Sequence, residues 1–136
     1  MKIHWKRIVI AAIWSELTLF ALYVAAMQYA GPAGRIISPL VIIILPFIGG
    51  LWVASKIESR FVLHGLLVGT IVSILYVPLR PLDPGVAVEL TMATAQRITM
   101  HLVVAALKIL GGAAGAYVGG RRRKKLLSAQ ASKSPS

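Results

Sequence analysis

Four long apolar stretches take up most of this 136-residue chain and leave no room for a separate soluble domain. They cover residues 8–29, 36–54, 61–79 and 98–118. A helix needs roughly 20 apolar residues to cross a bilayer core of about 30 Å. Only helices and closed barrels satisfy their backbone polar groups inside a bilayer. The sequence therefore predicts an all-α integral membrane bundle of four transmembrane helices, built as one domain over residues 1–120.

The fifteen Lys and Arg residues predict how these helices are oriented. Eleven of them precede the first span, lie between the second and third, or follow the fourth. Only Arg35, Arg80 and Arg97 fall on the other side. Loops rich in Lys and Arg stay in the cytoplasm. We therefore expect both termini in the cytoplasm, which an even number of spans requires.

The segment between the third and fourth spans contains three closely spaced prolines, at positions 78, 81 and 84. Because proline favours extended backbone, they predict a stiff, extended linker. Asp83 followed by proline then predicts an N-cap and the first position of a new helix. We expect a short external helix over residues 86–96, with Glu89 and Arg97 in contact with water at its ends.

A run of five basic residues follows the fourth span and opens the tail 121–136, which is predicted to be a disordered cytoplasmic segment. We expect the run to lie on anionic lipid headgroups of the bilayer. The alternative is a docking site for an acidic protein or nucleic acid. Position at a helix end accounts for the net charge of +11, so we expect no nucleic-acid partner. The run consists of Arg121, Arg122, Arg123, Lys124 and Lys125.

Two charged residues interrupt the apolar runs, Glu16 in the first span and Lys108 in the fourth. An ionisable side chain in hydrocarbon costs roughly 3 kcal/mol on insertion scales, so it usually faces protein, a partner or water. At 1.5 Å per residue, Glu16 lies about 12 Å and Lys108 about 15 Å from the cytoplasmic ends of their helices. This common depth predicts an intramembrane ion pair or a neutral hydrogen bond. A purely structural pair, a proton relay and the absence of contact all stay open.

Polar residues accompany both charges toward the expected outer surface. Tyr23 lies one heptad beyond Glu16, and His101 lies one heptad beyond Lys108. Arg97 continues the stripe of His101 by one further turn. We expect these three residues to extend the polar contact outward.

Glycines mark the faces on which the third and fourth spans are expected to pack. Gly65 and Gly69 form a small-x-x-x-small pair, and Gly111, Gly115 and Gly119 form a glycine zipper. Such faces let two helix backbones approach closely. The zipper can serve packing within the bundle or contact with a second copy of the chain.

Two prolines shape the second span. Ser38 and Pro39 predict the N-cap and first position of its helix. Pro46 lies inside the span, where it removes one backbone hydrogen bond and predicts a kink that frees the carbonyl of Ile42. The bend accommodates neighbouring helices, or the freed carbonyl binds a cation.

Two stretches resemble known membrane proteins. Residues 13–17, Ile-Trp-Ser-Glu-Leu, resemble the first span of small multidrug resistance transporters, which implies proton exchange at Glu16 against a cationic drug. Residues 47–56 contain a Gly-Gly-x-x-x-small-basic turn and are followed by His-Gly-x-x-x-Gly at 64–69. This pattern resembles small bacterial four-span membrane proteins of unassigned function. It implies a multi-pass protein of the bacterial inner (cytoplasmic) membrane and supplies no activity.

Sequence motifs of enzymes, metal sites and cofactor sites are missing. The chain has no cysteine, no glycine-rich phosphate loop and no His-x-x-x-His pair. We therefore expect no enzyme, no cofactor and no metal. The favoured role is a structural or accessory membrane protein that acts through helix packing, as a homo-oligomer or in a larger membrane complex. The alternative is a small proton-coupled transporter or channel centred on Glu16.

Overall fold

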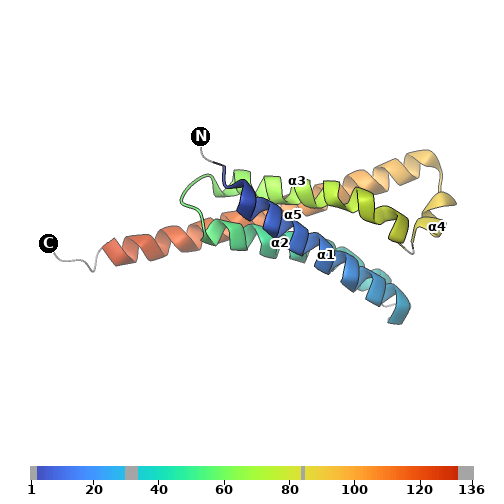
Figure 1. Ribbon diagram of the computed structural model, residues 1–136, viewed down its shortest axis with the longest axis horizontal. Coiled ribbons are helices and arrows are strands. Elements are labelled where there is room, and N and C mark those ends of the chain that lie inside the picture. The colour runs from blue at the N-terminus through green and yellow to red at the C-terminus, as the bar shows by residue number, and fades with distance from the viewer. Residues whose placement is uncertain (1–2, 30–33, 84, 132–136) are drawn as a thin grey trace.

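The computed structural model describes residues 3–29, 34–83 and 85–131, and within these ranges it is helical with no strand (Figure 1). Consecutive long helices run back and forth along one axis, as Figure 1 shows. The elements are α1 (Trp5–Tyr29), α2 (Gly34–Ser55), α3 (Phe61–Leu79), the 3-10 turn η2 (Arg80–Leu82), α4 (Val86–Leu90) and α5 (Thr94–Ala131).

The outer surface of the bundle has the character of a membrane protein. Three segments are long and apolar enough to cross a bilayer, namely Trp5–Ala26, Phe61–Leu82 and Thr94–Ala129. In α2 the apolar stretch that qualifies is shorter, Leu40–Ser55. Large apolar side chains such as Trp14, which is 72% exposed, point outward along these helices. The predicted all-helical fold is confirmed, and three of the helices are long and apolar enough to cross a bilayer, whereas the four spans and their orientation stay predictions.

The helices form a bundle in which α1 and α5 lie across from each other. Both helices pack on α2 and on α3, most extensively α5 on α2, and α2 also packs on α3. We call the end with the first turn of α1, residues 56–60 and the last turns of α5 the terminal end. The opposite end, with η2 and α4, is the distal end. Toward the distal end, at the right of Figure 1, the pair α1 and α2 diverges from the pair α3 and α5.

Close packing against the glycines of α5 holds the terminal half together. A Cβ atom added at any of Gly111, Gly115 and Gly119 would come within 3.0 Å of backbone oxygens of α2. On the neighbouring face of α5, a Cβ at Gly112 would overlap the backbone of α3 at Gly65. These glycines therefore pack within the bundle, which is one of the two uses that the sequence left open. The buried apolar core lies beside them and comprises Ile8, Ala11, Ala12, Val53, Ala54, Ile57, Phe61, Val68, Val72 and Ala116.

The predicted disordered tail is wrong over residues 121–131, because α5 continues as a helix to Ala131. This stretch contains strong helix formers such as Leu126 and Leu127 and has neither glycine nor proline. Residues 132–136 lie outside the described ranges.

The predicted extended linker after the third span is also wrong. Helix α3 runs through Pro78 to Leu79 and passes directly into η2. A proline fixes φ near −65°, which suits a tight helical turn as well as an extended chain. The external helix is present as α4, but it ends at Leu90 rather than near residue 96. A turn then leads into α5 at Thr94.

In the second span, the predicted N-cap at Ser38 is wrong, because α2 already begins at Gly34. The helix continues through Pro46, which is almost fully buried. The Ser15 hydroxyl donates a hydrogen bond of 3.2 Å to the carbonyl of Leu45, the residue before this proline. The predicted kink at Pro46 stays a prediction.

Candidate functional site

Glu16 and Lys108 form a buried ion pair at the point where the two helix pairs begin to diverge. The Lys108 Nζ atom donates to Glu16 Oε1 at 3.0 Å and to Oε2 at 2.8 Å. The two side chains are only 3% and 1% exposed. The predicted contact is therefore confirmed, whereas a functional role for the pair stays a prediction.

The Lys108 side chain has a second neighbour besides Glu16, the aromatic ring of Tyr76. The Lys108 ammonium lies 5.1 Å from the centre of the Tyr76 ring, close enough for a cation–π interaction. Lys108 thus has a carboxylate on one side and the face of an aromatic ring on another. Since α1 and α5 make little backbone contact of their own, the pair is a direct link across the bundle. A buried pair of this kind specifies which helices are joined, even where its net energy is small.

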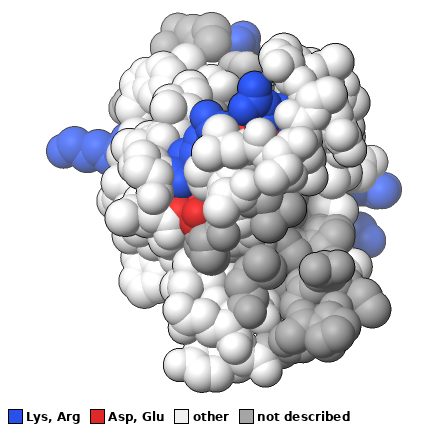
Figure 2. All heavy atoms as spheres, turned by 90° about the vertical axis from the view of Figure 1, so that its right-hand side faces the viewer, with Lys and Arg blue, Asp and Glu red and all other residues white. Residues whose placement is uncertain are grey.

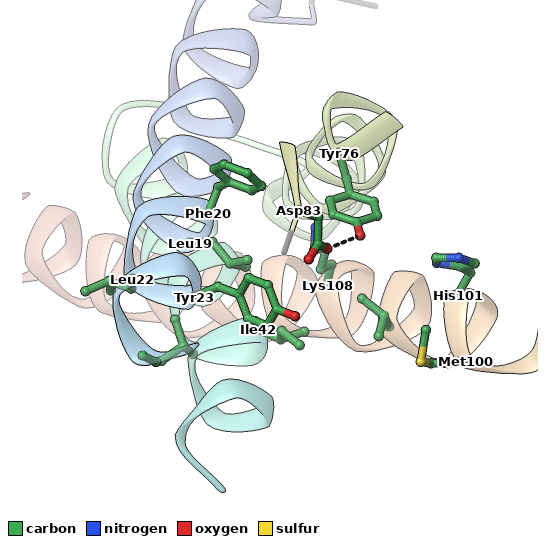
Figure 3. Close-up of a pocket in the computed structure, with 13 residues that line it drawn as sticks. Leu19, Phe20, Leu22, Tyr23, Ile42, Tyr76, Asp83, Met100, His101 and Lys108 are labelled. Atoms are coloured by element: carbon green, nitrogen blue, oxygen red, sulfur yellow. Dashed lines mark hydrogen bonds between the residues drawn. The ribbon is translucent and has the colours of Figure 1, made fainter. Parts of the chain in front are cut away.

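A cavity of about 250 Å³ opens distal to the ion pair, between the two diverging helix pairs (Figure 3). Lys108 lies at its inner end, but Glu16 is not among its lining residues. Its walls are mostly apolar. The apolar lining residues are Leu19, Phe20, Leu22, Ala26, Val41, Ile42, Met100 and Val104, and the polar ones are Tyr23, Tyr76, Asp83, His101 and Lys108.

Asp83 organises the polar rim of this cavity. Its carboxylate accepts a 2.5 Å hydrogen bond from the Tyr76 hydroxyl and a 2.6 Å bond from the backbone N–H of Gly85. The Tyr23 hydroxyl approaches from α1, as Figure 3 shows, and it lies so near Gly85 that an added Cβ there would meet it at 2.5 Å. The predicted N-cap at Asp83 is wrong, because α4 begins only at Val86 and the Asp83 side chain instead binds the turn before it. The predicted first helical position, residue 84, lies outside the described residues.

Glu89 fastens α4 to the rest of the bundle. It is 4% exposed and accepts hydrogen bonds from Arg80 at 2.5 Å and from His101 at 2.8 Å. Burial raises the pKa of this carboxyl, but the hydrogen bonds from His101 and Arg80 outweigh it and hold the pKa below its usual value. The predicted contact of Glu89 with water is wrong, because two cationic or polar partners surround it.

The three residues predicted to extend the polar contact have different positions. Tyr23 and His101 do line the cavity together with Lys108. Arg97 does not, and its guanidinium donates to the Thr94 hydroxyl at 3.3 Å on the same helix. Figure 2, which faces the distal end, shows Lys or Arg side chains beside the acidic ones near the middle of this view, and further basic side chains at its margins.

Sequence reasoning missed the roles of Tyr76, Asp83 and Glu89. A usable signal was present, since the chain has only four acidic residues. In so apolar a chain, each carboxylate near a helix end is expected to bind a nearby donor. Arg80, His101 and Tyr76 were the donors within reach once the turn at η2 had formed.

The terminal end contains a buried histidine. His64 is 1% exposed, and its Nδ1 lies 2.9 Å from the Arg60 carbonyl while its Nε2 lies 3.4 Å from the backbone nitrogen of His4. Both ring nitrogens thus have protein partners, with Nδ1–H donating and Nε2 accepting. Across the parts of the chain that the structure describes, no three His, Cys, Asp or Glu side chains gather to hold a metal ion.

The basic run is divided between different surroundings. Arg123 donates to the carbonyl of Ser55 at the end of α2. Arg121 lies 5.6 Å from the Tyr117 ring centre, and Lys124 lies 5.7 Å from that of Phe61. The remaining two members, Arg122 and Lys125, are exposed, as are Arg121 and Lys124.

No protein-family model matches the chain, and comparison with curated proteins and with solved structures gives no match either. The two resemblances drawn from the sequence therefore stay expectations.

Proposed function

We propose that this chain is a small integral membrane protein of structural or accessory type, which acts through helix packing with itself or with a larger membrane complex. The observation that carries this proposal is that the Glu16 carboxylate is fully occupied by Lys108 and has no contact with the cavity. Both carboxylate oxygens are bound by one ammonium group, and Glu16 does not line the cavity. The pair therefore acts as a cross-link between α1 and α5.

The alternative, a transporter centred on Glu16, fits this geometry less well. A carboxylate that exchanges protons during transport has to meet water or substrate in some state of the protein. Here Lys108 lies at the inner end of the cavity and occupies both oxygens of Glu16. A fixed ammonium in that position also repels a cationic substrate. The accessory role accordingly has the better support.

We further propose that the four long helices all cross the bacterial inner membrane, with both termini in the cytoplasm. The antiparallel order of the helices supports an even number of crossings (Figure 1). The bias of Lys and Arg toward the terminal end supports the orientation. Although the apolar part of α2 is short, its 22 residues span about 33 Å, which is enough for the bilayer core.

The faces available to a partner differ from those expected from the sequence. The glycines of α5 lie against α2 and α3, so they do not offer a free surface. The large side chains that point outward remain, for example Trp14 on α1 and Ile74 on α3. A partner helix in the membrane would therefore meet bulky apolar side chains rather than glycine.

Co-purification from native membranes in mild detergent tests the accessory role. We expect the wild-type protein to elute with a defined partner or as a defined oligomer, and Glu16→Gln to lower its abundance or change the assembly. A control change at an exposed position of the same helix, Gln28→Ala, should alter neither. If Glu16→Gln retained abundance and assembly but abolished a proton-coupled uptake activity, the transporter alternative would replace this proposal.

A further inference from the structure

A second cavity lies at the terminal end, beside the basic run. It has a volume of about 590 Å³ and lies between residues 58–63 and the part of α5 around residues 117–124. Three basic side chains line it, Arg60, Arg121 and Lys124, against one acidic residue, Glu58. The cavity is therefore suited to an anion.

Two of the three basic side chains of this cavity lie over aromatic rings. Arg121 lies over Tyr117 and Lys124 over Phe61. A ring attracts a cation through its face without taking a conventional hydrogen bond from it, so the N–H donors remain available to a ligand. Within residues 3–29, 34–83 and 85–131, the ion pairs present involve other residues than these two.

The helical geometry of α5 separates the basic run into two faces. Arg121 and Lys124 are three residues apart, so they share the face that turns toward the cavity. Arg122 and Lys125 are also three residues apart, but they do not line the cavity. The chain thus carries its own internal control, a second pair of cations at the same height with no cavity beside it.

We propose that this cavity binds the headgroup phosphate of an anionic phospholipid. The cations lie where the apolar part of α5 gives way to charged residues, which is the level of the headgroups in a bilayer. The cavity also has an apolar wall, formed by Val62, Leu63 and the Tyr117 ring. A phospholipid supplies both parts at once, a phosphate for the basic side chains and an apolar body for this wall.

Gly120 shapes the inner wall of the cavity. The Phe61 ring packs so closely on it that an added Cβ would overlap the ring. This packing fixes the ring under Lys124 and keeps the start of α3 close to α5. The site therefore depends on the fold of the terminal end, and it does not rest on the accessory role proposed above.

Lipid titration of the full-length protein in neutral detergent, followed by native mass spectrometry, tests the proposal. The probes are phosphatidylglycerol, phosphatidylcholine with the same acyl chains, and inorganic phosphate. We expect one phosphatidylglycerol per chain and no comparable binding of phosphatidylcholine. The double change Arg121→Gln and Lys124→Gln should weaken that binding ~30-fold, since each charge near an anionic headgroup is worth about fivefold.

The matched control removes the same charge from the same helix, by Arg122→Gln and Lys125→Gln, and should change the binding less than about twofold. Equal losses in both variants would overturn the proposal, because binding would then follow total charge. Tight binding of inorganic phosphate alone would also overturn it in favour of an anion site. If the first double variant fails to fold, Arg60→Gln in the loop gives the same comparison, and a wild-type affinity there would count against the site.

Discussion

The two halves of the bundle are held together by different means. In the terminal half, glycine faces and small apolar side chains bring the helix backbones into direct contact. In the distal half, the helix pairs diverge and leave a cavity that is bridged by polar side chains. Close apolar packing stabilises one arrangement only, whereas polar bridges can break and re-form individually. The terminal half is therefore expected to be rigid and the distal half to be the more adaptable.

The sequence of α5 explains much of this difference, together with the glycines of α2 and α3 that pack on it. Toward the distal end its inward face carries the larger side chains of His101, Val104 and Lys108, and from Gly111 onward it carries glycine. A helix with side chains on that face holds its neighbours at a distance of 8–10 Å or more, whereas glycine permits closer approach. The ion pair lies between the widely spaced distal half and the closely packed terminal half.

The largest effect is expected where the two halves meet. Lys108→Met leaves Glu16 as an uncompensated buried carboxylate, and breaking a buried pair in this way costs about 3–5 kcal/mol. The double change Glu16→Gln with Lys108→Met should recover most of that loss. Unfolding in mixed detergent micelles measures both free energies. A double variant no more stable than the worse single would show that the pair contributes nothing as a unit.

The terminal half should respond nearly as strongly to an added side chain. Gly115→Val forces atoms into the backbone of α2 at Phe47, and overpacking of this kind costs about 1–3 kcal/mol. The neighbouring change Ala114→Val places the same side chain on an exposed position of α5. It should cost less than about 0.5 kcal/mol in the same unfolding assay. Equal effects of the two changes would refute the tight contact between α2 and α5.

Much of this arrangement was open to prediction from the sequence. The all-helical membrane class follows from the length of the apolar stretches, and the contact between Glu16 and Lys108 follows from the cost of a lone charge in hydrocarbon. The glycine pattern predicted close packing, but it did not say which helix would fill the groove. That choice depends on how short the loops are and on which faces remain, neither of which is a local property.

The hydrogen bonds of Asp83 and Glu89 at the distal end could not be predicted from the sequence. Asp83 and Glu89 find their partners only because η2 turns tightly and folds α4 back onto α5. Three prolines suit such a turn and an extended linker equally well. The helix beyond Gly120 was missed for a different reason. The small polar residues at the end of the tail suggested disorder for the whole tail, although the residues before them are helix formers.

A smaller effect, of about 1 kcal/mol, is expected from pH in the distal half. The pKa of Glu89 is lower in the folded protein than its usual value of 4.5. The unfolded chain therefore binds more protons as pH falls below that value. The stabilisation from Glu89 is complete above about pH 4.5 and is lost as pH falls through the lower, folded pKa.

Glu89→Gln should remove this part of the pH dependence, and Glu58→Gln, at an exposed position of the terminal end, should leave it in place. Thermal unfolding in detergent measures the difference in stability between these variants. A range of roughly pH 3 to pH 7 covers the titration of a carboxyl group. Hydrogen exchange of the α4 amides locates the difference. Loss of protection in the terminal half instead would contradict the assignment of this pH response to the distal end.

The smallest expected effect is a gain in stability at the terminal end. Arg60 has a φ of 54°, in the left-handed region that only glycine adopts without steric cost, and it precedes the first residue of α3. Arg60→Gly should therefore stabilise the folded protein by about 0.5 kcal/mol, since the relief of strain is partly offset by the greater freedom of glycine in the unfolded chain. Arg60→Ala removes the same charge but keeps the Cβ, so it should give no such gain in thermal unfolding without lipid. If both variants gained equally, the cause would be repulsion between Arg60 and the neighbouring cations of α5, and backbone strain at this turn would be excluded as the source.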